Sequence, residues 1–289
     1  MPSAPTTEQD KLAELRARID VIDADIHGLL MERSTIIDAL VAAKGTQSGA
    51  DATPTGVAFR PLREADMMRR LVERHEGTLP IITVENIWRV IISTFTRLQA
   101  DYVVHLDGTA DAVAMHDTAR FYFGFGLDLI DEDDPESVIA AVAASTTDLG
   151  VVALNRVALT PWWRTLGGDG PHILTRLPFL QQTGRPADLP ALVISPKVSE
   201  PGEPDITVYD ASWVVGGNRA ESVLTEAGIE ILARHTGEGT DALIAVPSDM
   251  DAASVTSLLE EAGVEPGRLR EVGGYAAAID LDDDGDDDF

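Results

Sequence analysis

The feature that most constrains the fold is an uninterrupted apolar pattern between Lys11 and Lys44. No proline breaks the run, and its apolar residues recur at steps of three and four: Leu12, Leu15, Ile19, Ile22, Ile26 and Leu29, then Ile36, Ile37, Leu40 and Val41. Such steps place side chains on one helix face, so the pattern predicts a single helix about 50 Å long. Short neighbouring helices cannot bury a seam of that length, which favours a partner helix from a second copy of the chain.

Two cations occupy seam positions that the pattern reserves for apolar side chains. Arg33 follows Leu29 by four residues, and Lys44 lies about 16 Å further along the axis, within about 20° of the same face. Unpaired charges there are costly, so both need an acidic partner or an anionic ligand. Arg16 lies about 25 Å from Arg33 and about 100° round the helix, so it can reach the same small site only from a second chain. On periodicity alone, ordinary ion pairs or side chains extending off the seam are the simpler interpretation.

The following residues predict two shorter helices, which complete an N-terminal helical domain over residues 1–104. Gly45–Gly56 is rich in Gly, Ser, Thr and Pro and is predicted to be a loop. Pro61 suits the first turn of a second helix that runs to about His75. Thr83 can cap a third helix, Val84–Ala100, which has large apolar residues on one face.

Beyond this domain the pattern alternates between strands and helices, which predicts an α/β lobe over residues 105–200. The expected elements are Tyr102–Leu106, Asp111–Phe123, Leu127–Ile130, Pro135–Ala144 and Leu149–Leu154, with a returning strand at Leu192–Ser195. A β-α-β-α-β series favours a parallel sheet covered by helices. Trp162–Pro190 is expected to be irregular.

Residues 201–280 predict a last, ferredoxin-like α+β module after the linker Pro196–Asp205. Its elements follow a β-α-β-β-α-β order: Ile206–Ala211, Arg219–Ala227, Glu230–His235, Ala242–Pro247, Ala252–Ala262 and Arg268–Ile279. The Asp-rich residues 281–289 are expected to be a disordered, solvated tail. The predicted fold class is therefore multidomain, first α and then α/β.

The formal net charge of −27 is concentrated in the later part of the chain. Residues 1–104 carry 12 Lys+Arg against 15 Asp+Glu, whereas residues 105–289 carry 10 against 34. A field this negative repels nucleic acid and anionic membrane surfaces, so neither is an expected partner, and an anionic substrate must bind in the first third. There is no Cys and no secretory signal, so we expect a cytoplasmic protein without disulfides.

The polar residues of the first hundred positions follow an ordered pattern. They are Leu15-Arg16-x-x-Ile19-Asp20-x-Ile22-Asp23, Leu29-Leu30-x-x-Arg33, Lys44, Arg60-Pro61-Leu62-Arg63-Glu64 and Gln99. No single element is specific, but together they closely resemble the all-helical (type II) chorismate mutase family over residues 8–101. The resemblance implies an intertwined three-helix homodimer, in which each site is lined mostly by one chain and completed by the other.

The resemblance also implies a dicarboxylate substrate, chorismate, and a role for six side chains in its rearrangement to prephenate. Arg33, Arg63 and the partner subunit's Arg16 would hold the carboxylates, Lys44 and Gln99 would donate to the ether oxygen, and Glu64 would accept from the ring hydroxyl. The rearrangement is unimolecular and needs no cofactor or metal, so none is predicted. The role of Arg60, and which of Thr94 and Phe95 lines the pocket, stay open.

Two weaker resemblances cover the rest of the chain. Val103–Pro196 resembles a shortened prephenate dehydratase domain in which the catalytic motifs are degraded. The Glu-Asn-Ser segment falls on Leu154-Asn155-Arg156 and the Thr-Arg-Phe motif on Pro190-Ala191-Leu192, while Thr175-Arg176-Leu177 lies earlier in an expected loop. We therefore predict no dehydratase activity. The last module resembles the small-molecule-sensing ACT module, but its effector motif is not evident near Ala233-Arg234-His235-Thr236.

Two other functions are compatible with the sequence. One is a lyase of the same helical fold that removes pyruvate from isochorismate, and the other is a noncatalytic regulator that binds aromatic metabolites. Glu64 and Gln99 together favour the mutase over the lyase, whereas Phe95 and Arg60 would support the regulator.

Overall fold

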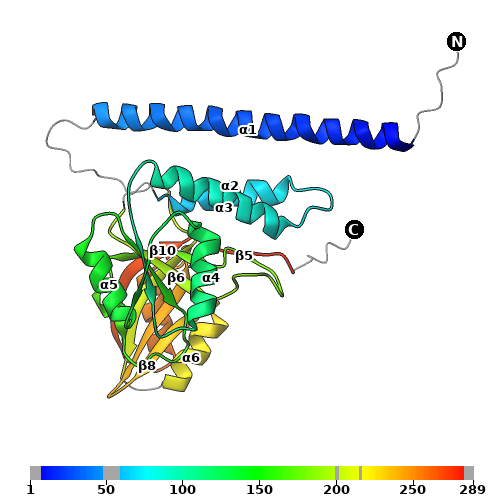
Figure 1. The fold of residues 1–289 in the computed structure, drawn as a ribbon. Helices are drawn as coiled ribbons and strands as arrows, with labels where there is room; N and C mark the ends of the chain where they lie inside the picture. The colour runs from blue at the N-terminus through cyan, green and yellow to red at the C-terminus, as the bar shows by residue number, and fades with distance from the viewer. Residues whose placement is uncertain (1–7, 48–58, 199–201, 215–216, 283–289) are drawn as a thin grey trace, which may run out of the picture. The chain divides into compact units, whose positions relative to one another are not determined.

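The computed structural model describes residues 8–47, 59–198, 202–214 and 217–282 (Figure 1). The chain divides into two units, Met1–Thr55 and Gly56–Phe289, and each is treated by itself. None of the described helices combines the length and apolar content needed to cross a bilayer.

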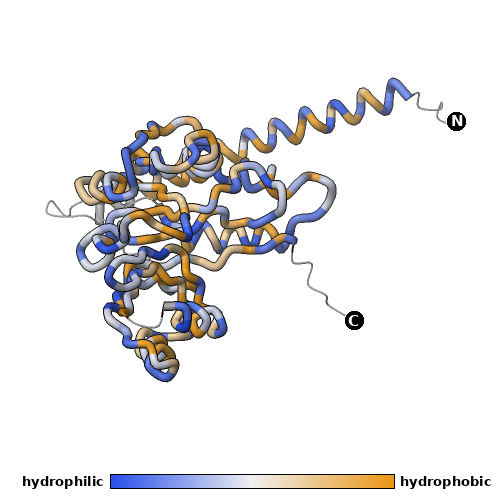
Figure 2. The backbone as a smooth tube through the Cα atoms, turned by 90° about the horizontal axis from the view of Figure 1, so that it is seen from below, coloured by the Kyte–Doolittle hydropathy of each residue, from blue (hydrophilic) through white to orange (hydrophobic). Residues whose placement is uncertain are grey.

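The first unit contains one long helix, α1 (Glu8–Gln47), of 40 residues. The prediction of a single uninterrupted helix is thus confirmed, and the helix takes in the first residues of the expected loop; residues 48–56 of that loop lie outside the described residues. The apolar seam is exposed, with Leu15 at 54%, Ile22 at 52% and Leu29 at 64%. Hydrophobic and hydrophilic stretches alternate along the tube of α1 in Figure 2. The helix therefore has a long apolar face available to a partner.

The second unit is built on one sheet of nine strands. In sheet order these are β2 (Leu129–Glu132), β1 (Val104–Asp107), β3 (Leu149–Ala153), β6 (Ala191–Ser195), β4 (His172–Leu177), β10 (Pro266–Tyr275), β7 (Ile206–Trp213), β9 (Thr240–Pro247) and β8 (Glu230–Thr236). The predicted lobe and the predicted module therefore share a single sheet. The predicted boundaries at 104/105 and 200/201 stay predictions.

The strand directions correct the expectation of a parallel lobe. β1 pairs in parallel with β2 and β3, as predicted, but β6 is antiparallel to both β3 and β4. The segment expected to be irregular also contains the 3-10 turn η1 (Trp162–Thr165), β4 and the short β5 (Leu180–Gln181). Thr175-Arg176-Leu177 accordingly lies in strand β4, not in a loop. The prediction of a loop was wrong because the Gly and Pro residues on either side of this strand favour turns and dominate the local pattern.

The last module has the predicted order of elements. Its strands pair antiparallel in the order β10-β7-β9-β8, with helices α6 (Gly217–Glu226) and α7 (Ala252–Glu261) between them. The expected closing strand is shorter than predicted. It ends at Tyr275, and Ile279–Asp280 form a separate strand, β11, that pairs with β5. Asp282, in the predicted tail, accepts hydrogen bonds from the backbone and hydroxyl of Thr183, and 283–289 lie outside the described residues.

Aspartates cap three of the helices that cover this sheet. Asp111 precedes α4 (Ala112–Phe123), Asp134 precedes α5 (Pro135–Ala144) and Asp251 precedes α7. Each carboxylate accepts a hydrogen bond from a backbone N–H of the first turn, which otherwise has no partner within the helix. Local sequence therefore fixes where these helices begin.

The two halves of the sheet meet where β4 lies beside β10, and a glycine permits this approach. Gly273 has φ +140° and pairs with Ile173. A Cβ at Gly273 would lie 2.1 Å from the Ile173 carbonyl oxygen, which no side chain can tolerate. A shared core completes the junction, with Trp163 and Ile194 from one half and Val208 and Leu243 from the other.

A buried carboxylate also joins the two halves. Asp210 on β7 is fully buried and accepts hydrogen bonds from Trp163 Nε1 at 3.1 Å and Arg268 Nε at 2.6 Å. Arg270 Nη2 lies 3.1 Å from the same carboxylate. Because Trp163 belongs to η1 and the arginines to β10, Asp210 ties the turn to the sheet.

We expect Asp210→Ala to lower the free energy of unfolding by about 3 kcal/mol. This value lies at the low end of the range for breaking a buried ion pair, because Arg268 and Arg270 are both partly exposed to solvent. Urea unfolding followed by tryptophan fluorescence measures the change. Asp249→Ala, at an exposed position, is the matched control and should change stability by less than about 0.5 kcal/mol. Equal stability of the Asp210 variant and this control would contradict the proposed tie.

Helices α2 (Pro61–Glu73) and α3 (Ile81–Arg97) belong to the second unit. They share a small core with the segment around β5 and β11; its buried members include Met68, Ile82 and Leu180. α3 begins at Ile81 after Pro80, two residues before the expected cap at Thr83. Pro80 is extended and makes no side-chain cap, and its carbonyl oxygen accepts hydrogen bonds from the N–H groups of Thr83 and Val84.

Candidate active site

Three of the six predicted site residues lie on α1. Arg16 is exposed. Arg33 and Lys44 lie eleven residues apart on the same uninterrupted helix. The side chain of Lys44 lies outside the described part of the structure. How these residues lie relative to the second unit stays a prediction.

Two other predicted residues occupy the first turn of α2. Arg60 is the N-cap residue without a side-chain cap, and Pro61 occupies the first helical turn, where its missing N–H costs no hydrogen bond. Arg63 is exposed, whereas the Glu64 side chain is only 13% exposed. The helix therefore presents Arg63 to solvent and turns Glu64 toward the interior.

Gln99 follows the end of α3 and is half-buried. Its Nε2 donates to the Phe95 carbonyl oxygen at 3.0 Å, one turn earlier. Phe95 is buried in the second unit and Thr94 is exposed. To reach a ligand, the Gln99 amide would have to leave this backbone contact.

Glu64 lies at the outer end of a buried ion network whose other members are not among the predicted site residues. Arg89 Nη1 lies 3.3 Å from Glu64 Oε2, and Arg89 Nη2 lies 3.5 Å from Glu85 Oε1. Arg185 Nη2 lies 3.1 Å from the other Glu85 oxygen. Glu85 is fully buried, and this burial raises the pKa of its carboxyl while Arg89 and Arg185 act to lower it. Four charges of alternating sign thus run inward from Glu64.

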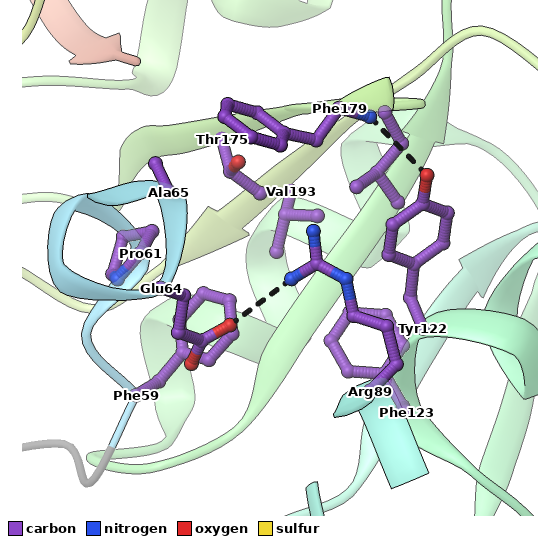
Figure 3. A pocket seen from close by; sticks show the side chains of 11 residues that line it. Phe59, Pro61, Glu64, Ala65, Arg89, Tyr122, Phe123, Thr175, Phe179 and Val193 are labelled. Atoms are coloured by element: carbon purple, nitrogen blue, oxygen red, sulfur yellow. Dashed lines mark hydrogen bonds and ion pairs between the residues drawn. The ribbon is translucent and has the colours of Figure 1, made fainter. Parts of the chain in front are cut away.

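Glu64 and Arg89 both line a small pocket whose cavity volume is about 20 Å³, room for about one water molecule (Figure 3). Its other walls are mostly apolar and aromatic: Phe59, Pro61, Ala65, Tyr122, Phe123, Thr175, Leu177, Phe179 and Val193. The Tyr122 hydroxyl accepts a hydrogen bond from the Phe179 N–H at 3.2 Å, and burial raises the pKa of Tyr122 to about 12. Tyr122 therefore stays neutral at physiological pH, and the charges in this pocket belong to Glu64 and Arg89.

Part of this network has a local signal in the sequence. Glu85 and Arg89 are four residues apart, a spacing that places opposite charges together on a helix, and they interrupt the apolar face of α3. Arg185 has no such signal, because it reaches Glu85 from 100 residues away in the chain. Only the folded second unit brings it to α3.

The residues in place of the dehydratase motifs lie around a different depression. Leu154, Arg156 and Pro190 line it together with Arg176 and Glu230. Arg176 Nη2 donates to Glu230 Oε1 at 2.9 Å, and its other amino group binds the second oxygen. Arg176, the arginine of the Thr175-Arg176-Leu177 tripeptide, therefore forms an ion pair with Glu230 of the ferredoxin-like module.

Comparison with known proteins supports the interpretation of the polar pattern. Residues 15–100 match the family model described as type II chorismate mutase. The chain is 30% identical over 152 residues to the bifunctional chorismate mutase/prephenate dehydratase of Pseudomonas aeruginosa, covering 51% of this chain and 40% of that protein. It is 34% identical over 87 residues to the protein of the same description from Neisseria gonorrhoeae, covering 30% of this chain and 22% of the relative. The predicted resemblance of the N-terminal third is thus confirmed.

The chain spans less than half the length of both relatives. Among solved structures it is similar to the prephenate dehydratase of Streptococcus mutans, at 13% identity and a TM-score of 0.39, covering 62% of this chain and 99% of that one. A structure described as GqqA, a novel type of quorum quenching acylase, has 16% identity and a TM-score of 0.39, covering 62% of this chain and 97% of that one. Similarities this distant define no activity for the present chain.

Proposed function

We propose that this protein is a chorismate mutase that rearranges chorismate to prephenate. The observation that carries the proposal is the family match over residues 15–100, which contains all six polar residues predicted to form the site. The same segment matches proteins described as bifunctional chorismate mutase/prephenate dehydratases. An aromatic amino acid biosynthetic role in the cytoplasm follows from this proposal.

The active unit is a homodimer formed through α1. Most of the described seam residues of this helix are exposed, from Leu12 at 49% to Leu40 at 45%, and Ile37 is half-buried. A second copy of α1 carries the same repeat and can bury both seams along their whole length. Because Arg16 lies about 25 Å from Arg33 on the helix, such a dimer is also the arrangement in which both serve one site.

The substrate dianion is held by arginines. Arg33 and Arg63 bind its carboxylates with the partner subunit's Arg16, because guanidinium groups match the geometry of carboxylates. This clamp holds the flexible ether side chain of chorismate over the ring. The entropic cost of reaching the reactive shape is then met largely by binding energy, which lowers the barrier of the chemical step.

Lys44 and Gln99 act on the bond that breaks. The ether C–O bond breaks as a new C–C bond forms within the same molecule, so no proton, electron pair or group leaves the substrate. Negative charge grows on the ether oxygen in the transition state, and the ammonium group and the amide N–H stabilise it there more than in the ground state. Glu64 accepts a hydrogen bond from the ring hydroxyl and so fixes the ring.

The sheet-containing part of the chain is proposed to be noncatalytic. The positions aligned with the dehydratase motifs hold Leu154, Arg156 and Pro190, which supply no acid for dehydration. The ferredoxin-like order of the last module supports an ACT-like role in folding, dimerisation or sensing of a small molecule.

The deciding experiment is to incubate the purified full-length protein separately with chorismate and with isochorismate and to identify the products. We expect prephenate from chorismate. Pyruvate from isochorismate would instead establish the lyase, and chorismate binding without turnover would establish a noncatalytic regulator.

A further inference from the structure

We propose that Arg89 is a positioning residue for Glu64, and that Arg185 couples the sheet-containing part of the chain to the mutase site through Glu85 and Arg89. The proposal rests on the mutase function proposed above and deepens it. It gives a role to the buried ion network, of which the mutase resemblance includes only Glu64.

The charges balance only when all four residues are counted together. Glu85 is fully buried and contacts two guanidinium groups, which leaves one positive charge in excess. Glu64 supplies the second carboxylate, on the outer side of Arg89. A buried cation without that carboxylate would be costly, so Arg89 attracts the Glu64 side chain and keeps it ionised. An ionised Glu64 can only accept hydrogen bonds, and its charge makes it a stronger acceptor for a substrate hydroxyl than the protonated form.

Arg89 is held firmly enough to position another side chain. Its side chain is only 9% exposed, one amino group faces Glu85, and its guanidinium carbon lies 4.9 Å from the centre of the Tyr122 ring. Because the guanidinium is a rigid plane, fixing one edge on Glu85 and one face on Tyr122 sets the direction of the amino group that faces Glu64. Glu64 then needs no direct contact with the sheet to be oriented by it.

Arg185 connects this arrangement to the C-terminal end of the described chain. Its side chain is 1% exposed, donates to the carbonyl oxygens of Leu180 and Pro186, and lies 5.1 Å from the centre of the Phe121 ring. The segment that bears it follows β5, which pairs with β11. A shift of β5 and β11 therefore moves Arg185, and Glu85 passes that change to Arg89.

The test is a double-mutant cycle on chorismate turnover in the full-length protein. Arg89→Gln should lower kcat/KM about tenfold to a hundredfold, the size of loss that misplacing a catalytic group causes. It should also move the acidic limb of the pH–kcat/KM profile to higher pH, because the cation that favours ionised Glu64 is gone. Arg70→Gln, at an exposed position on α2, is the matched control and should leave both readouts unchanged.

In the Glu64→Gln background, Arg89→Gln should cause no further loss, because Arg89 acts through Glu64. Arg185→Lys should cause a smaller loss that also disappears in that background. If Arg89→Gln fails to fold, Arg89→Lys, which keeps the charge but not the planar fork, takes its place in the cycle.

Additive losses in the double variant, or an unmoved acidic limb, would show that Arg89 is merely structural and would overturn the inference while the mutase stands. A wild-type protein that does not rearrange chorismate would overturn both.

Discussion

Replacing Arg33 with alanine is expected to lower kcat/KM for chorismate by a factor of about 10³ or more, with the dimer intact. Arg33 is proposed to bind a substrate carboxylate on the helical seam, and its loss removes both a charge-assisted pair and the restraint on the reactive shape. Removal of one electrostatic donor from a preorganised site commonly costs a factor of about 10² to 10³. Loss of chorismate absorbance measures turnover, and light scattering after gel filtration measures the dimer.

The matched control is Arg18→Ala on the same helix. Arg18 is exposed and lies off the apolar seam, so its loss removes a charge of the same type and leaves the proposed site complete. We expect wild-type turnover. Wild-type turnover in the Arg33 variant would contradict the site assignment, whereas a dissociated dimer would assign Arg33 to assembly.

Much of the fold follows from local sequence because its elements carry their own signals. The apolar steps of three and four define most of α1, and the N-cap aspartates define where α4, α5 and α7 begin. The β-α-β-β-α-β order of the last module is likewise visible, since each strand is a short apolar run between turn residues.

The junctions are less accessible to prediction because they depend on contacts between distant segments. β4 lies in a segment rich in Gly and Pro, and its place in the sheet comes from antiparallel pairing with β6 and from the approach of Gly273 to Ile173. No local periodicity records that approach. The single sheet across the lobe and the module therefore emerged only from the structure.

The candidate site divides in the same way. The resemblance to type II chorismate mutases implied Arg33, Lys44, Arg63, Glu64 and Gln99 as site residues, and the family match covers all of them. The environment of Glu64 was not predicted, because its neighbour Arg89 is fixed by Glu85, and Glu85 in turn by the distant Arg185. The family resemblance indicates the groups that could contact a substrate, and tertiary packing determines what holds them.

The strongest test of the shared site is a dimer that carries a different lesion in each chain. Arg16→Ala and Arg33→Ala should each give an inactive homodimer. If Arg16 acts across the interface, a dimer of one Arg16→Ala chain and one Arg33→Ala chain has one site with both lesions and one intact site. Its activity per dimer should therefore recover to about half that of the wild type. Two differently tagged copies, co-expressed and purified over both tags, provide this dimer.

The control dimer pairs Arg33→Ala with Arg63→Ala. Both arginines are proposed to serve the site of their own chain, so each site of this dimer lacks one of them and no recovery is expected. Recovery in the first dimer but not in the second requires Arg16 to cross the interface. If the first dimer stays inactive, Arg16 and Arg33 act from the same chain or Arg16 acts elsewhere, and the dimeric site proposed from the α1 seam is wrong. Because both dimers contain the Arg33→Ala chain and differ only in the substitution of the other chain, the comparison reports the geometry of the site separately from any effect of Arg33→Ala on its own chain.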